Sequence, residues 1–69
     1  SSSMDSDRIS MMSRIISTLR ENKESYIEDI AEKTGLPYRQ TASLCRILEN
    51  DGIIYADLLQ RYSINTKNF

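Results

Sequence analysis

Apolar residues in the first third of the chain recur with the period of a helix. Spacings of three and four residues join Ile9, Met12, Ile16 and Leu19. This spacing is typical of an amphipathic helix with one face on a core, and it predicts a helix over about residues 7–22. Met11 and Ile15 widen the apolar stripe at its edge, so we expect these two side chains to be available to a partner.

A second, shorter helix is predicted after the polar break at residues 22–24. Ser25 and Glu28 have the spacing of a capping box, in which the hydroxyl and the carboxylate each satisfy a free amide of the first turn. Ile27, Ile30 and Ala31 supply its apolar stripe. Gly35 is expected to end this helix in a left-handed conformation.

A third helix is predicted over about residues 37–50. Leu36 is expected to point inward before it, and Pro37 suits the first turn of a helix. The apolar positions recur at helical spacing and are expected to pack on the first two helices: Thr41, Leu44, Cys45 and Leu48. Ile47 is expected at the core periphery, and Gly52 ends the helix.

The pattern changes to that of a β-hairpin after Gly52. Residues 53–56 are apolar and rich in strand-forming side chains, and residues 61–64 alternate polar and apolar. The connection between them, Asp57-Leu58-Leu59-Gln60, has an acid, two leucines and no glycine. Either one leucine folds under the turn, or both are exposed and form an apolar patch that suggests a partner surface.

Two segments resemble winged helix-turn-helix regulators. Residues 27–37 are similar to the second helix and turn of that family, and residues 46–54 are similar to the end of its recognition helix and the entry to the wing. Gly35, Leu36 and Gly52 match the positions of the family's turn glycine, plug leucine and wing glycine. The resemblance implies a mainly α fold with a small β-hairpin, a three-helix winged helix-turn-helix. We expect it to span residues 7–64, between a disordered N-terminal tag or tail (1–6) and a C-terminal tail (65–69).

Charge is distributed unevenly along this 69-residue chain of net charge −1. Three basic residues and no acid lie between Lys33 and Leu48, and two basic residues and no acid lie between Leu58 and Phe69. The remaining positions hold four basic and ten acidic residues. Although the total charge argues against nucleic acid, the two acid-free segments are candidates for contact with a polyanion.

The resemblance implies that the third helix lies in the major groove of double-stranded DNA. Its outward positions would be Arg39, Gln40, Ser43 and Arg46, since Arg and Gln can read guanine and adenine edges. Tyr38 and Ser43 suit phosphate oxygens. Arg61 and Lys67 extend the predicted contact beyond the helix. The predicted function is therefore sequence-specific DNA binding by a small transcription regulator. The alternatives are an ordinary solvated helix face and, for Arg46, a pair with Glu49 or Asn50.

Protein docking is the second prediction, because winged helices also serve as docking modules in replication and transcription complexes. The candidate partner contacts are Met11, Ile15, Leu58 and Leu59. A homodimer is also predicted, because small winged helices usually bind DNA as dimers. Its candidate contact is the wide stripe of the first helix (Met11, Met12 and Ile15) with Phe69 of the tail.

Residue types limit the remaining function classes. Histidine is absent and Cys45 is the single cysteine, so no intrachain disulfide, no cysteine zinc site and no catalytic residue is expected, and no metal or cofactor. The acids of residues 21–32 are interpreted as a solvated face. The absence of a long apolar run predicts no membrane span, and the lone thiol is compatible with an intracellular setting. Whether the chain is a whole protein or one domain of a longer one stays open.

Overall fold

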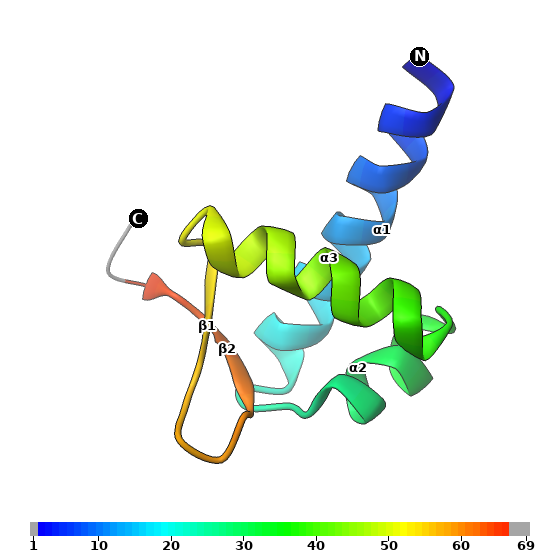
Figure 1. Ribbon diagram of the computed structural model, residues 1–69. Coiled ribbons are helices and arrows are strands. Elements are labelled where there is room, and N and C mark those ends of the chain that lie inside the picture. Colours follow the sequence, from blue (N-terminus) through cyan, green and yellow to red (C-terminus); the bar gives the residue numbers. More distant parts are fainter. Residues whose placement is uncertain (1, 67–69) are drawn as a thin grey trace.

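The computed structural model describes residues 2–66, with side chains from residue 6 onward. Three helices precede a two-stranded antiparallel hairpin (Figure 1): α1 Ser2–Glu21, α2 Ile27–Thr34, α3 Tyr38–Asn50, β1 Ile54–Ala56 and β2 Tyr62–Ile64. Helices α2 and α3 form the helix-turn-helix, and the hairpin (residues 54–64) is the wing. The predicted fold class, mainly α with a small hairpin in a three-helix winged helix-turn-helix arrangement, is confirmed.

Helix α1 is longer than its apolar pattern predicts. It begins at Ser2, so residues 2–6 are helical where the sequence led us to expect a disordered tail. The segment contains no glycine or proline, the residues that oppose a helix most strongly. An apolar repeat shows only the turns that face a core, and the first turns of α1 extend beyond it. The helix ends at Glu21, one residue before the predicted end.

The prediction of a capping box at the start of α2 is wrong, because no such cap forms. The N-cap residue is Tyr26, which makes no side-chain cap bond. Ser25 is buried, and its hydroxyl donates to the Asn22 carbonyl over 3.2 Å. Its backbone instead pairs with Tyr62 through two hydrogen bonds of 3.1 and 2.7 Å. Ser25 therefore joins the hairpin as a one-residue bridge, which takes it out of the position a cap requires.

The turn between α2 and α3 follows the sequence prediction closely. Gly35 adopts φ 77°, and its N–H bonds to the Ala31 carbonyl over 2.9 Å. Only glycine takes this left-handed conformation without steric cost. The Arg14 guanidinium of α1 donates to the Thr34 carbonyl and ties the turn to the first helix. Pro37 is the N-cap of α3 rather than its first residue, so the helix begins one residue later than predicted.

The hairpin has a simple antiparallel register, with Ile54 opposite Ile64 and Ala56 opposite Tyr62. Each strand is one residue shorter at its start than predicted. Gly52, at φ 76°, turns the chain from α3 into β1. The N–H of Ile53 bonds back to the Leu48 carbonyl, which fixes where the wing leaves the helix.

All three helices and the hairpin contribute to one core. Its buried members are Ile15, Leu19, Ile30, Leu44, Cys45, Leu48 and Ile54, with Thr41 buried beside them. Each large apolar side chain removed from water contributes about 1.5–3 kcal/mol. Ile15, predicted as a partner contact, is fully buried, because three elements close over the stripe that the sequence shows as wide. Among residues 2–66, no helix is both long enough and apolar enough to cross a bilayer.

Candidate nucleic-acid interface

The outer face of α3 carries the five residues that the sequence analysis placed against DNA. All five are exposed: Tyr38, Arg39, Gln40, Ser43 and Arg46. Because successive residues turn by about 100°, Arg39, Ser43, Arg46 and Asn50 fall on one line opposite the buried side. We call this line, Arg39-Ser43-Arg46-Asn50, the outer line of α3. It contains two arginines and no acid.

The flanks of the outer line differ from each other. Gln40 lies toward α1, where its amide nitrogen is 3.2 Å from the sulfur of Met11. Met11 is only half-buried, so it keeps part of the exposure that the sequence analysis predicted for it. Glu49 lies on the opposite flank, and its carboxylate is 3.5 Å from the hydroxyl of Tyr62. Tyr38 is 54% exposed at the start of the helix.

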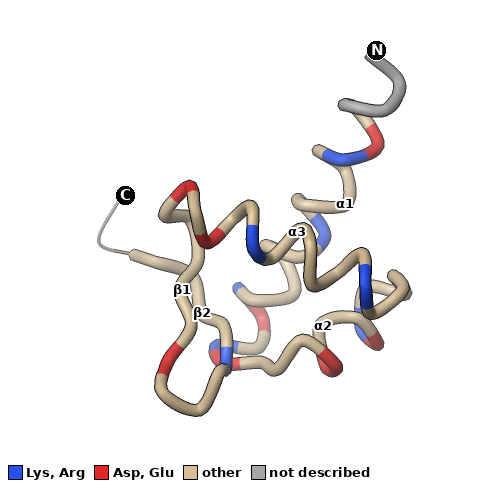
Figure 2. The backbone as a smooth tube through the Cα atoms, in the orientation of Figure 1, with Lys and Arg blue, Asp and Glu red and all other residues tan. Residues whose placement is uncertain are grey.

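The two arginines of the outer line are free of carboxylate partners within the part of the chain that is described. The structure shows no pair between Arg46 and Glu49, the alternative that the sequence left open; the ion pairs found among the described residues both belong to Arg61. Figure 2 shows the two basic positions along α3 and an acidic one only near its C-terminal end. The first turn of α3 has no acid. Two uncompensated positive charges therefore face solvent from one helix.

Arg61 of the wing is used differently from the arginines of α3. Its guanidinium contacts Glu24 over 2.7 Å and Asp57 over 2.9 Å. The hydrogen bond that the Arg61 guanidinium donates to the Asp57 carboxylate is the main reason that the pKa of Arg61 is raised. Two carboxylates hold one cation, so the wing presents no free positive charge at this position. We therefore leave Arg61, which the sequence analysis included in the predicted DNA contact, out of the candidate interface. Lys67, the other basic residue predicted there, lies outside the described residues.

The wing turn is organised by Asp57. One carboxylate oxygen accepts from the N–H groups of Leu59 and Arg61, both over 2.9 Å. The bond from the Arg61 N–H is the largest cause of the lowered pKa of Asp57. Gln60 takes φ 66°, the left-handed conformation that closes the turn. Asp57, the acid of the predicted connection, is thus the residue that shapes the turn.

Both leucines of the turn are exposed. Leu58 is 102% exposed and Leu59 is 60% exposed, so neither folds under the hairpin. Of the two alternatives that the sequence left open, the structure selects the exposed patch. We call Leu58 and Leu59 the wing tip. The turn that bears them projects beyond the helices (Figure 1).

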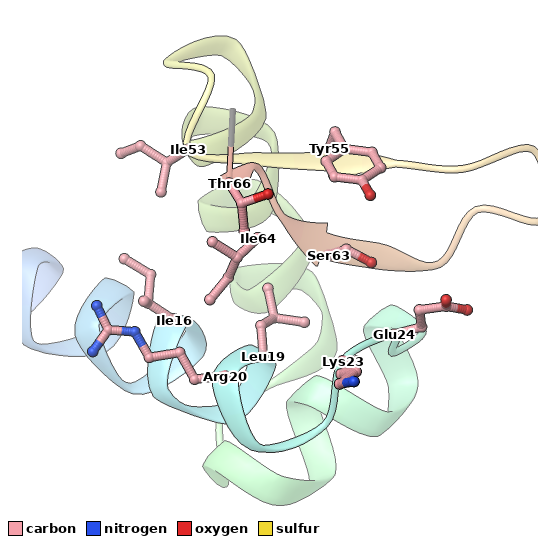
Figure 3. Close-up of a pocket in the computed structure, with 10 residues that line it drawn as sticks. All are labelled: Ile16, Leu19, Arg20, Lys23, Glu24, Ile53, Tyr55, Ser63, Ile64 and Thr66. Carbon is pink, nitrogen blue, oxygen red and sulfur yellow. The ribbon is translucent and has the colours of Figure 1, made fainter. Parts of the chain in front are cut away.

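A groove that the sequence pattern did not predict lies between the C-terminal half of α1 and the outer side of the hairpin (Figure 3). Its volume is about 730 Å³. Its apolar floor is formed by Ile16, Leu19, Ile53 and Ile64, with Tyr55 and Ser63 on the hairpin wall. Arg20, Lys23 and Glu24 line its rim. Apart from the breadth of the α1 stripe, nothing in the sequence signals it, because two distant segments build it.

The described residues contain no group of three or more His, Cys, Asp or Glu side chains arranged to hold a metal ion. Cys45 is fully buried, and burial is the main cause that raises the pKa of its thiol to about 11, with a smaller contribution from Glu49. A thiol with such a pKa is almost entirely protonated at neutral pH and is a poor nucleophile.

Comparisons of the chain with protein-family models, curated proteins and solved structures found no significant match. The proposed function therefore rests on the geometry and charge of α3 and the wing.

Proposed function

We propose that the chain binds double-stranded DNA with α3 in the major groove. The observation that carries this proposal is the outer line of α3, where Arg39 and Arg46 are exposed, have no ion pair with any described residue, and have no acid on the same line. An acid on this line would repel phosphate at the point of closest approach.

The spacing of the outer line suits a helix laid along a groove. Arg39 and Arg46 are seven residues apart, or about 10 Å along the helix axis. Side chains at this spacing reach base edges or phosphates about three base pairs apart, at a rise of about 3.4 Å per base pair. Arginine can bind guanine with two hydrogen bonds, while Ser43 between the two arginines suits a phosphate oxygen.

The acidic residues of α2 favour one orientation of the protein on DNA. Glu28, Asp29 and Glu32 are all exposed, and a face that carries them is repelled by the polyanion. The protein would therefore approach DNA with α3 foremost, and the acids limit non-specific binding through other faces. Because only this face would meet the duplex, we expect a modest number of contacts with phosphates.

The test is a fluorescence titration of the whole chain against mixed-sequence duplexes at two salt concentrations. A groove binder loses affinity as salt rises, because bound phosphates release counterions. Arg39→Ala should weaken binding by roughly 5- to 150-fold and relax sequence preference. Arg20→Ala removes the same charge from the groove rim of α1 and serves as the matched control. Absence of binding at low salt, or equal losses for both variants, would overturn the proposal.

The exposed wing tip favours a second candidate function, protein docking. Leu58 and Leu59 are adjacent, and both are more than half exposed. Apolar side chains presented together on a projecting turn are typical of a surface that meets a partner. The docking surface and the outer line of α3 are on different elements, so the two functions are compatible.

A further inference from the structure

The groove between α1 and the hairpin combines an aliphatic floor with two cations on its α1 rim. Arg20 and Lys23 are exposed there, and neither belongs to an ion pair found among the described residues. We propose that the groove binds a medium-chain fatty acid, with the acyl chain on the floor and the carboxylate at these two cations. This inference goes beyond the proposed function and does not depend on DNA binding by α3.

The floor of the groove is incompletely buried in the chain by itself. Ile16, Ile53 and Ile64 are half-buried, although all three pack against the core. Figure 3 shows the side chains of Ile16, Leu19 and Ile64 converging between α1 and the hairpin. A bound acyl chain would remove apolar surface of the three isoleucines from water, and this burial would drive binding.

The dimensions of the groove suit a small molecule better than a polypeptide. Its volume of about 730 Å³ lies within the range of small-molecule pockets. The hairpin wall is built from strands of three residues, each about 10 Å long. A partner helix of three turns is about 16 Å long and would extend beyond this wall. A peptide backbone would also find no hydrogen-bond partner on an aliphatic floor, whereas an acyl chain has no polar group to satisfy.

The acid on the rim does not cancel the two cations. Glu24 lines the same groove, but its carboxylate is already 2.7 Å from the guanidinium of Arg61. Figure 3 shows Arg20 and Glu24 toward opposite ends of the groove, with Lys23 between them. A single negative charge is therefore favoured at the Arg20 end. Glu24 disfavours a doubly charged head group such as a phosphate monoester, since like charges repel.

A carboxylate matches the donors that the rim offers. A guanidinium such as that of Arg20 can donate two parallel hydrogen bonds to a carboxylate, while the ammonium of Lys23 acts as a point charge. The rim is exposed, so each ion pair should tighten binding only about two- to fivefold. The acyl chain must therefore supply most of the affinity, with each buried methylene contributing roughly three- to fourfold.

An NMR titration of the whole chain with decanoate, kept below its micelle concentration, tests the proposal. Methyl signals of the floor residues Ile16, Ile53 and Ile64 should shift and saturate, with a dissociation constant on the order of 0.1–1 mM. Leu58 and Ile9 are internal controls, because they are 102% and 63% exposed and lie outside the groove. Their signals should stay unchanged, whereas non-specific adsorption of the acyl chain would shift them first.

Two further ligands separate the contribution of the chain from that of the head group. Octanoate, which is two methylenes shorter, should bind roughly tenfold more weakly than decanoate. Decylammonium has the same chain length and the opposite charge, so it should bind at least tenfold more weakly at neutral pH. Equal affinity for decanoate and decylammonium would overturn the assignment of the rim.

Matched variants test the rim and the floor. Arg20→Gln combined with Lys23→Gln should weaken decanoate binding roughly four- to 25-fold, at two- to fivefold for each exposed ion pair. Arg8→Gln combined with Lys33→Gln removes two exposed cations outside the groove and should bind like the wild type. Ser63→Phe would place a ring on the groove wall and should weaken binding at least tenfold, with the helical circular dichroism unchanged.

Three results would overturn the proposal: no shift of the floor signals at millimolar decanoate, shifts that appear first at the exposed control residues, or equal losses for the two double variants. The wild-type titration decides the matter even if a variant does not fold. Failure of DNA binding would leave this test unaffected, because Arg39 and Arg46 do not line the groove.

Discussion

The outer line of α3 and the wing both contain arginine, and they use it in opposite ways. Within the described part of the chain, Arg39 and Arg46 are exposed and have no carboxylate partner, whereas Arg61 forms ion pairs with Glu24 and Asp57. The residue type is the same, but the α3 arginines lie on a line without acids, while Arg61 lies where two chain segments bring acids together. A basic residue near a predicted interface is therefore informative only when its neighbours in space are known.

The two regions also differ in what they expose. The outer line of α3 is cationic and polar, while the wing presents two leucines and a neutralised arginine. In a DNA-binding wing, a flexible or basic tip commonly follows a groove. This difference is the basis of our proposal that α3 binds nucleic acid and that the wing binds protein.

The largest difference is expected between two variants that each lose one arginine, Arg46 of the outer line or Arg61 of the wing. Arg46→Ala should weaken duplex binding by roughly 5- to 150-fold, the range for loss of one specific arginine contact. Arg61→Ala should change affinity by less than about twofold, since its charge is already offset by two carboxylates. Titrations of both variants against one duplex at low salt would measure this. Equal losses would contradict the comparison and would return the wing to the DNA interface.

A smaller effect is expected on stability in acid. Hydrogen bonds from Arg61 and Leu59 lower the pKa of Asp57 from its ordinary value of 3.8. A group with a lowered folded-state pKa stabilises the fold above its unfolded pKa, and this contribution is lost as the pH falls through the folded value. The wing should therefore lose stability below about pH 4.

Thermal unfolding of Asp57→Asn between pH 7 and pH 3 checks this linkage. The variant should melt at a lower temperature than the wild type at pH 7, and the gap between them should narrow toward pH 3. Asp51→Asn, which alters an exposed acid outside the wing, is the matched control. A gap that stays constant with pH would show that the Asp57 carboxylate does not hold the turn.

The smallest effect on this comparison is expected from a test of the buried side of α3. This side packs on the core and so holds the outer line in place. With its pKa raised to about 11, Cys45 should react far more slowly with a thiol reagent in the folded chain than in denaturant at pH 8. The reagent's absorbance in both states measures the difference. Rapid labelling of the folded chain would indicate that α3 separates easily from the core, which would weaken the case for a rigid reading helix.

The hydrophobic pattern predicted the order of the elements and most of the core. Gly35 was expected to be left-handed and Thr41, Leu44, Cys45 and Leu48 to be buried, and all of these expectations are confirmed. The pattern was wrong where a residue's role depends on distant segments. Ser25 pairs with Tyr62 rather than capping α2, and Ile15 is buried by elements that close over its face.

The candidate site also has some properties that the sequence predicts and others that depend on distant segments. Exposure of Arg39, Gln40, Ser43 and Arg46 follows from helical geometry and could be predicted from the positions of the buried residues alone. The neutralisation of Arg61 by Glu24 could not, because the two residues are 37 positions apart and only the pairing of Ser25 with Tyr62 brings them together.

The sequence by itself determined which face of each helix is apolar, where glycine ends a helix, and that α3 has an acid-free outer line. These properties depend on residues within one or two turns of each other, and local geometry suffices to place them. Only the tertiary structure decided that both tip leucines are exposed, that Arg61 is neutralised, and that a groove lies between α1 and the hairpin. Each of these depends on long-range packing, which brings together side chains that the chain itself keeps apart.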